Sequence, residues 1–193
     1  MSTSENIDPA AMTRIMVRPL GSPLPLGFFA FAVGSALQGA FDAGWIPPPE
    51  AHAVAIALLT FVGPLELLAC IIAYLARDTA GATSLGFFGA SWMVSGSWLS
   101  MMAPDARSAT IAVFAIVAAL ALVLLAIASA ATKPMFSVVL VLATVRVTLL
   151  AAHHLGAGQA VNVAGAAVAF VASAMAFYAA LALLFEDLKK RTV

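Results

Sequence analysis

The chain has 193 residues, of which 63% are hydrophobic and only 9% are charged. Soluble domains carry about 25% charged residues, so this composition excludes a soluble globular protein and indicates a membrane protein. The net charge at neutral pH is zero, which argues against nucleic acid as a partner.

Six apolar segments are long enough to cross a bilayer, because a spanning helix needs about 20 residues and must satisfy its backbone hydrogen bonds within itself. We place these segments at roughly 25–44, 51–76, 82–103, 108–131, 134–154 and 160–185. The predicted fold is therefore all-α, a polytopic membrane protein with six transmembrane helices in one bundle over residues 21–188. Residues 1–20 are predicted to form a cytoplasmic N-terminal tail without the features of a signal peptide, and residues 189–193 a basic cytoplasmic C-terminal end.

Positive charges predict the orientation of the spans. Of the nine Lys and Arg residues, Arg107 falls alone on one side of the six-span arrangement, Arg146 falls within a span, and the other seven fall on the opposite side. By the positive-inside rule, both termini are expected in the cytoplasm, with the chain in the plasma (inner) membrane.

The first span begins with the sequence Ser22-Pro23-Leu24-Pro25-Leu26. Each proline lacks an N–H donor and pushes the residue before it toward an extended conformation. We expect the helix to begin near Leu26, with extended chain entering the membrane. A helix start that the prolines mark at the interface is the alternative.

Two ionisable residues lie near the middle of predicted spans. Glu66 follows a Gly63-Pro64 pair that predicts a kink in span two, and Arg146 lies near the centre of span five. At this depth an ionisable side chain costs about 2.5–3.5 kcal/mol on insertion scales, so each should have a partner. We predict an ion pair between Arg146 and Glu66, while the guanidinium also suits a passing anion.

Three more side chains are candidates for a path through the bundle. Trp92 lies near mid-span, where its N–H needs a partner, and either a pore-lining or a bundle-buried position would supply one. His153 shares a helical face with Arg146 and is a candidate to gate or shuttle protons, or else a hydrated interface histidine. Tyr178 is the polar aromatic residue deep in span six.

Motifs that would indicate catalysis are missing from the sequence. We find no nucleotide-binding loop, nucleophile elbow, redox motif or metal-ligand spacing, so we predict neither enzymatic activity nor a cofactor or metal. Small residues in spans three and six predict close helix packing.

Three stretches of the sequence resemble the acetate uptake transporter family, whose bacterial members include the succinate-acetate permeases. They are SPLPLGF at 22–28, GPLELLACIIAYLARDTAGATSLGFFGASW and SAMAFYAALALLFEDLKKRTV. The first stands in the place of the family's N-P-x-P-L-G-L motif before helix one, and its motif residues are Ser22, Pro23, Pro25, Leu26 and Gly27. The resemblance implies a homohexamer in which each protomer has its own path for small monocarboxylates, as a proton-coupled transporter or as a channel.

The resemblance also implies a constriction of aromatic and aliphatic side chains. It falls on Phe31, Trp92 and Ala143, or on Leu142 in place of Ala143 if the alignment shifts by one residue. The chain departs from the family pattern at several positions: Ser22 replaces an asparagine, Trp92 a tyrosine, Glu66 a glutamine and Arg146 an apolar residue.

Taken together, these features predict a permease or channel for small monocarboxylates such as acetate, with succinate as a further substrate. The carboxylate would contact Arg146 beside the constriction, with Glu66 holding the guanidinium. Two alternatives stay open. One is a channel for urea, short amides or other small neutral solutes, and the other is a membrane scaffold or sensor subunit that passes nothing.

Overall fold

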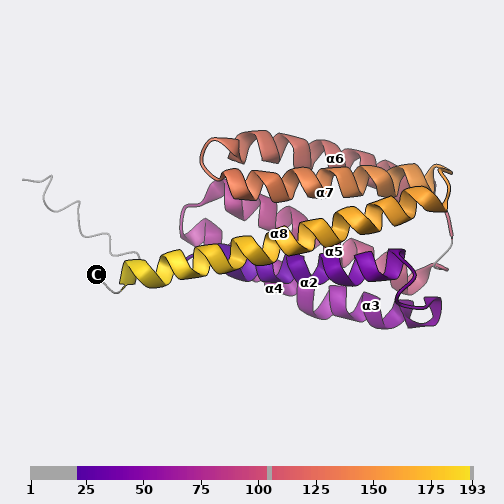
Figure 1. The fold of residues 1–193 in the computed structure, drawn as a ribbon, viewed down its shortest axis with the longest axis horizontal. Helices are drawn as coiled ribbons and strands as arrows, with labels where there is room; N and C mark the ends of the chain where they lie inside the picture. The colour runs from indigo at the N-terminus through magenta and orange to yellow at the C-terminus, as the bar shows by residue number, and fades with distance from the viewer. Residues whose placement is uncertain (1–20, 104–105, 192–193) are drawn as a thin grey trace, which may run out of the picture.

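A computed structural model describes residues 21–103 and 106–191 (Figure 1). The described chain is helical throughout and has no strand, which confirms the all-α prediction. Its helical elements are α2 (Leu24–Asp42), the 3-10 turn η1 (Pro48–Glu50), α3 (Ala51–Ala57), the π-helical turn η2 (Leu58–Val62), α4 (Gly63–Leu75), α5 (Thr79–Met101), α6 (Ala109–Ala130), α7 (Pro134–His154) and α8 (Gln159–Arg191). The predicted tail at 1–20 lies outside the described residues, and the predicted domain limits stay a prediction.

Within the part of the chain that the structure describes, five helical segments are long and apolar enough to cross a membrane. They are α2, the segment Pro48–Leu75 that joins η1 to α4, then α6, α7 and α8. The remaining predicted span corresponds to α5, whose 23 residues would extend about 34 Å at 1.5 Å per residue. Its glycines and serines lower its mean hydropathy, and Ser84, Gly89 and Gly96 among them are buried.

The first helix begins earlier than predicted. Helix α2 starts at Leu24, after Pro23 in a right-handed helical conformation, so the expected extended chain as far as Leu26 is wrong. The amide of Gly27 already donates to the carbonyl of Pro23 at 3.2 Å. Pro25 lies in the first turn, where its missing N–H would have had no partner in any case.

The second span is interrupted at the predicted place. The π-helical turn η2 ends at Val62, and Gly63 and Pro64 begin α4. Pro64 cannot donate to the carbonyl four residues back, and a π turn is one way to relieve that conflict. The wider turn also holds one more residue than an α turn, so it changes the direction in which every later side chain of α4 points.

Close packing of small residues builds the bundle. Figure 1 shows α8 crossing α2, with α6 beside α7, and the same pairs make the most extensive contacts. Ala169, Ser173 and Ala176 are buried on α8, and the Ser173 hydroxyl donates to the Ala32 carbonyl of α2 at 2.8 Å. The close packing predicted for span six is therefore confirmed.

The turns divide the molecule into two ends. Lys133, in the α6–α7 turn, forms an ion pair with Asp78 at the start of α5, and α2 begins at this same end. We call it the Lys133 end. The opposite end contains the last residue of α2, the α5–α6 connection and the turn between α7 and α8, and we call it the Asp42 end.

Candidate functional site

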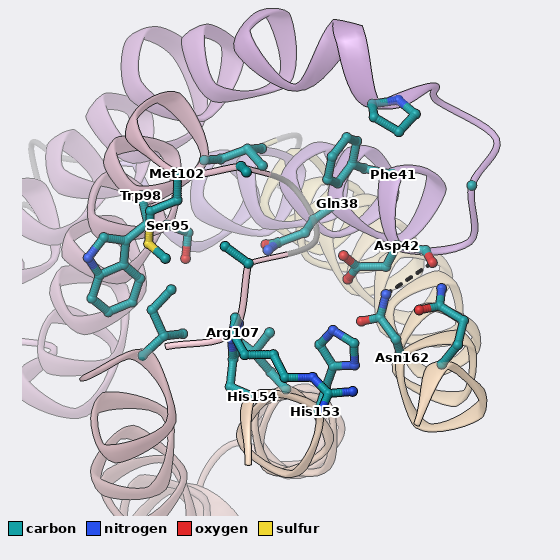
Figure 2. A pocket seen from close by; sticks show the side chains of 18 of the residues that line it. Gln38, Phe41, Asp42, Ser95, Trp98, Met102, Arg107, His153, His154 and Asn162 are labelled. Carbon is teal, nitrogen blue, oxygen red and sulfur yellow. Dashed lines mark hydrogen bonds between the residues drawn. The ribbon is translucent and has the colours of Figure 1, made fainter. Parts of the chain in front are cut away.

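A wide cavity of about 470 Å³ opens at the Asp42 end (Figure 2). Five α-helices, α2 and α5 to α8, contribute side chains to its wall. Polar and charged groups in that wall are Gln38 and Asp42 from α2, Ser95 from α5, Arg107 from the α5–α6 connection, His153 and His154 from α7, and Gln159 and Asn162 from α8. The cavity is therefore a polar vestibule within an otherwise apolar bundle.

A second, narrow cavity of about 60 Å³ lies next to the wide one, toward the middle of the bundle. The two cavities share Gln38, Ser95, Trp98 and Leu150 in their walls. Most other residues around the narrow cavity are aromatic or aliphatic, and Arg146 is the charged residue among them. A solute in the vestibule would thus reach a guanidinium as it entered the apolar part of the bundle.

Helical periodicity explains how these walls form. On α2 the lining residues Phe31, Ser35, Gln38 and Asp42 recur at spacings of four, three and four, so they share one helical face. On α7 the lining residues Ala143, Arg146, Leu150 and His153 recur at spacings of three, four and three, so they also share one helical face. The faces run from an apolar position near mid-helix to a polar one at the Asp42 end.

Aromatic rings line the narrow cavity side by side. The ring centroid of Phe31 lies 4.7 Å from that of Phe88 and 5.9 Å from that of Trp92. Ala143 lines the same cavity, whereas Leu142 does not. The residues that the family resemblance assigned to a constriction, Phe31, Trp92 and Ala143, are therefore neighbours around one cavity.

Space for the Trp92 ring depends on Gly34. A Cβ atom at Gly34 would lie 2.8 Å from Val62 and 3.1 Å from two ring carbons of Trp92. Glycine thus permits α2 to approach α5 and η2 closely at the level of the Trp92 ring.

Trp92 satisfies both interpretations of its mid-span position. It lines the narrow cavity and is 8% exposed. Its indole Nε1 donates to Oε1 of Glu66 at 3.2 Å, while Oε2 of Glu66 has no hydrogen-bond partner among the described residues. Glu66 is 0% exposed and lines neither cavity, so it lies behind the tryptophan.

The predicted ion pair between Arg146 and Glu66 is wrong. Arg146 instead pairs through Nη2 with Oδ2 of Asp42. Glu66 and Arg146 lie at a similar predicted depth in the membrane but do not contact each other. The Glu66 side chain points toward α5, where it accepts from Trp92, whereas the Arg146 side chain extends toward the Asp42 end. A long side chain can reach along the helix axis in this way to place its charge in a wetter environment.

Asp42 lines the wide cavity and pairs with Arg146, and the sequence analysis did not identify it as a candidate. It is the last residue of α2, and Nδ2 of Asn162 on α8 donates to its backbone carbonyl at 3.3 Å. A signal was present in the sequence, since Asp42 is an acidic residue inside the predicted first span and shares a helical face with Phe31 and Gln38.

The other predicted path residues divide into two groups. His153 lines the wide cavity, and its Nδ1 is buried without a hydrogen-bond partner among the described residues. The prediction that Tyr178 lies on a path through the bundle is wrong. Its side chain is 60% exposed on α8, points away from the bundle and lines neither cavity.

The proline motif lies at the Lys133 end, away from both cavities. Pro23, Pro25 and Gly27 are buried, Leu26 is half-buried and Ser22 is exposed. A Cβ atom at Gly27 would overlap the Leu85 side chain, so this glycine permits close packing of α2 on α5. Within the described ranges, no group of three or more His, Cys, Asp or Glu residues is placed to hold a metal.

Comparison with known proteins identifies the fold and the family of the chain. A search of the curated proteins gave no match. A solved structure described as the bacterial acetate channel SatP is 19% identical in sequence and has a TM-score of 0.79, covering 90% of this chain and 97% of that chain. The likeness shows a common fold.

A family model covers nearly the whole sequence. The model described as the GPR1/FUN34/yaaH family matches residues 4–190. This match confirms the resemblance to acetate uptake transporters noted in the sequence. The chain is a multi-pass membrane protein and belongs to the GPR1/FUN34/yaaH family.

Proposed function

We propose that the chain is a membrane permease that passes small carboxylates such as acetate through a path within each protomer. One observation carries the proposal: the Arg146 guanidinium lies in the wall of a narrow, otherwise uncharged cavity that aromatic rings line. The fold likeness to a protein described as an acetate channel supports it.

The chemistry of Arg146 fits this role. A carboxylate that leaves water for an apolar cavity loses its hydration, and a guanidinium can offset this cost with charge-assisted hydrogen bonds to both carboxylate oxygens. Arg146 lies at the boundary between the polar vestibule and the constriction, where the solute must shed water. Beyond it, the Phe31 and Trp92 rings restrict passage to solutes of small cross-section.

Several properties complete the proposal. The protein acts as a transporter or channel rather than as an enzyme, with succinate as a second substrate and with protons as a coupled ion. It lies in the inner membrane as a homohexamer with both termini cytoplasmic. Lys133 and Lys189 near the Lys133 end support this orientation through the positive-inside rule.

Flux into proteoliposomes tests the proposal. Purified protein is reconstituted, and the entry of acetate, succinate and urea is compared at pH 5.5 and 7.5, with and without an imposed proton gradient. We expect saturable carboxylate entry, and a dependence on the gradient would establish proton coupling.

Two variants assign the flux to Arg146. Arg146→Gln removes the charge and should sharply reduce acetate entry, while Lys133→Gln removes a cation from the Asp78 ion pair at the far end and should leave entry close to wild type. Wild-type acetate flux through the Arg146→Gln protein would refute the substrate role of Arg146.

A neutral solute is the second candidate, and one observation favours it. The Asp42–Arg146 pair is neutral as a unit, and Gln38, Ser95 and Asn162 add uncharged polar groups to the vestibule. Such a lining also suits urea or a short amide. Urea entry that acetate does not inhibit, in a protein that passes no carboxylate, would establish this alternative.

A further inference from the structure

Arg146 already holds a carboxylate. Beyond its Cα atom, the side chain of Asp42 is CH2–COO⁻, which is chemically an acetate group attached to the backbone. This group pairs with Nη2 of Arg146 between the wide and the narrow cavity, and the two side chains are 13% and 8% exposed. The position that a transported carboxylate would take on Arg146 is therefore occupied by a residue of the chain itself.

The surroundings of Asp42 favour exchange rather than a permanent lock. Asp42 is the last residue of α2, where the helix dipole presents its negative end and disfavours a second negative charge. Among the described residues, Asp42 has Arg146 as its side-chain hydrogen-bond partner, since Asn162 binds the backbone carbonyl rather than the carboxylate.

The Arg146 guanidinium also has a hydrogen-bond donor without an acceptor among the described residues. Its Nε is buried without a hydrogen-bond partner among the described residues, whereas a guanidinium can offer five donors. A structural ion pair in a membrane interior is stable when its donors and acceptors are fully satisfied, and this one is not. Asp42 therefore does not satisfy all the donors of Arg146, and a carboxylate that takes its place could use the donor that Asp42 leaves unpaired.

We propose that Asp42 is a tethered competitor for the carboxylate site on Arg146, so that each transported carboxylate must exchange with the Asp42 side chain. This inference rests on the proposed function and names the residue that regulates its binding step. When no substrate is present, Asp42 neutralises Arg146. When a small carboxylate arrives, it displaces Asp42 toward the vestibule, and the return of Asp42 helps to expel the solute.

The proposal predicts that removing Asp42 changes the affinity of the site for a carboxylate and the rate of its release in opposite directions. Without the competitor, a carboxylate should bind Arg146 more tightly and leave it more slowly. Asp42→Asn removes the negative charge at nearly constant size. Asp78→Asn is the matched control, because it removes the carboxylate of the other ion pair while keeping an N-cap side chain that can accept from Gly81.

Binding is measured separately from flux. Thermal unfolding of the full-length wild-type, Asp42→Asn and Asp78→Asn proteins is followed in detergent against sodium acetate at constant ionic strength. We expect the half-saturating acetate concentration of Asp42→Asn to fall by about tenfold or more, because charge-assisted hydrogen bonds to Arg146 no longer compete with Asp42. Its maximal acetate flux in proteoliposomes should fall, and Asp78→Asn should match wild type in both measurements.

Every outcome bears on the proposal. If Asp42→Asn is folded and binds acetate no more tightly than Asp78→Asn, the proposal is overturned. If Asp42→Asn folds only when acetate or formate is supplied, the added anion is replacing Asp42 and the proposal holds. If Asp42→Asn fails to fold with or without the anion, while the double variant Asp42→Asn/Arg146→Gln folds, the pair is structural and the proposal is overturned.

The proposed function and this inference fail in different ways. A wild-type protein that passes no carboxylate refutes the function, whereas tighter acetate binding by Asp42→Asn would still show a competitor on an anion site. A wild-type protein that passes carboxylates, with unchanged binding in Asp42→Asn, refutes the inference alone.

Discussion

Replacing Glu66 by leucine removes the acceptor that holds the Trp92 indole at the constriction. The hydrogen bond from Nε1 to Oε1 is 3.2 Å long, and Glu66 and Trp92 are 0% and 8% exposed, so water cannot substitute for the lost acceptor. The leucine also removes Oε2, a buried oxygen with no partner among the described residues. A lost hydrogen bond and the removal of an unsatisfied polar atom act in opposite directions on the free energy of unfolding, each by about 1–3 kcal/mol.

A double-mutant cycle isolates the bond from these opposing terms. The four proteins are wild type, Glu66→Leu, Trp92→Phe and the double variant, and their free energies of unfolding are measured in detergent micelles. Interhelical hydrogen bonds in membrane proteins contribute about 0.6 kcal/mol on average and about 1.7 kcal/mol at most. We expect a coupling energy in this range, because both groups are buried and the bond length is ordinary.

Glu66→Gln provides the control for this cycle. The glutamine keeps an oxygen that can accept from the indole, so a cycle between Glu66→Gln and Trp92→Phe should give a much smaller coupling energy. A coupling energy below about 0.3 kcal/mol in the Glu66→Leu cycle would lie within the usual additivity error and would refute the hydrogen bond as a stabilising contact.

Three further predictions concern the constriction and the packing around it. Phe31→Ala removes a ring that contacts Phe88 and Trp92, and we expect the ratio of butyrate flux to acetate flux to rise in proteoliposomes. An unchanged ratio would show that Phe31 does not limit passage. Gly34→Ala places a Cβ atom 2.8 Å from Val62 and should cost about 1–3 kcal/mol in unfolding free energy through overpacking, whereas Gly158→Ala, with nothing within 4 Å, should be near neutral. Equal stabilities of the two alanine variants would contradict this packing. Ser173→Ala removes the hydrogen bond to the Ala32 carbonyl and should lower the free energy of unfolding by about 0.6 kcal/mol. A loss of more than about 1.7 kcal/mol would show that this hydrogen bond is not the only contact that the substitution removes.

The sequence predicts the helices well because the bilayer constrains them strongly. Each apolar run must close its own hydrogen bonds, so the apolar runs lie within a few residues of the observed helices, except that α8 continues to Arg191 instead of ending near residue 185. Span three, which became α5, is the one that hydropathy marks least clearly. Helix α2 begins at Leu24, two residues before the predicted start, because the extended preference of residues before proline does not prevent a helix from beginning there. In the first turn of a helix, a missing N–H removes no intrahelical bond.

The pairing of charges could not be predicted in the same way. Hydropathy gives the depth of Glu66 and Arg146 but not the direction in which each points around its helix axis. The π turn η2 rotates the part of span two that contains Glu66, and it directs this carboxyl to Trp92 rather than to α7. The sequence marked the break at Gly63-Pro64 without indicating the size of that rotation.

The unequal distribution of charge along the path also has a kinetic consequence. Among the described residues, every ionisable side chain that lines the two cavities lies on the Asp42 side of the Phe31–Trp92 constriction: Asp42, Arg107, Arg146, His153 and His154. On the proposed path, a carboxylate arriving from that side would find a binding step before the aromatic rings, and one arriving from the Lys133 end would meet the rings first. Such an asymmetry could not drive accumulation, because at equal concentrations the fluxes in the two directions balance. It would instead make entry from the Asp42 end saturate at a lower carboxylate concentration than entry from the Lys133 end.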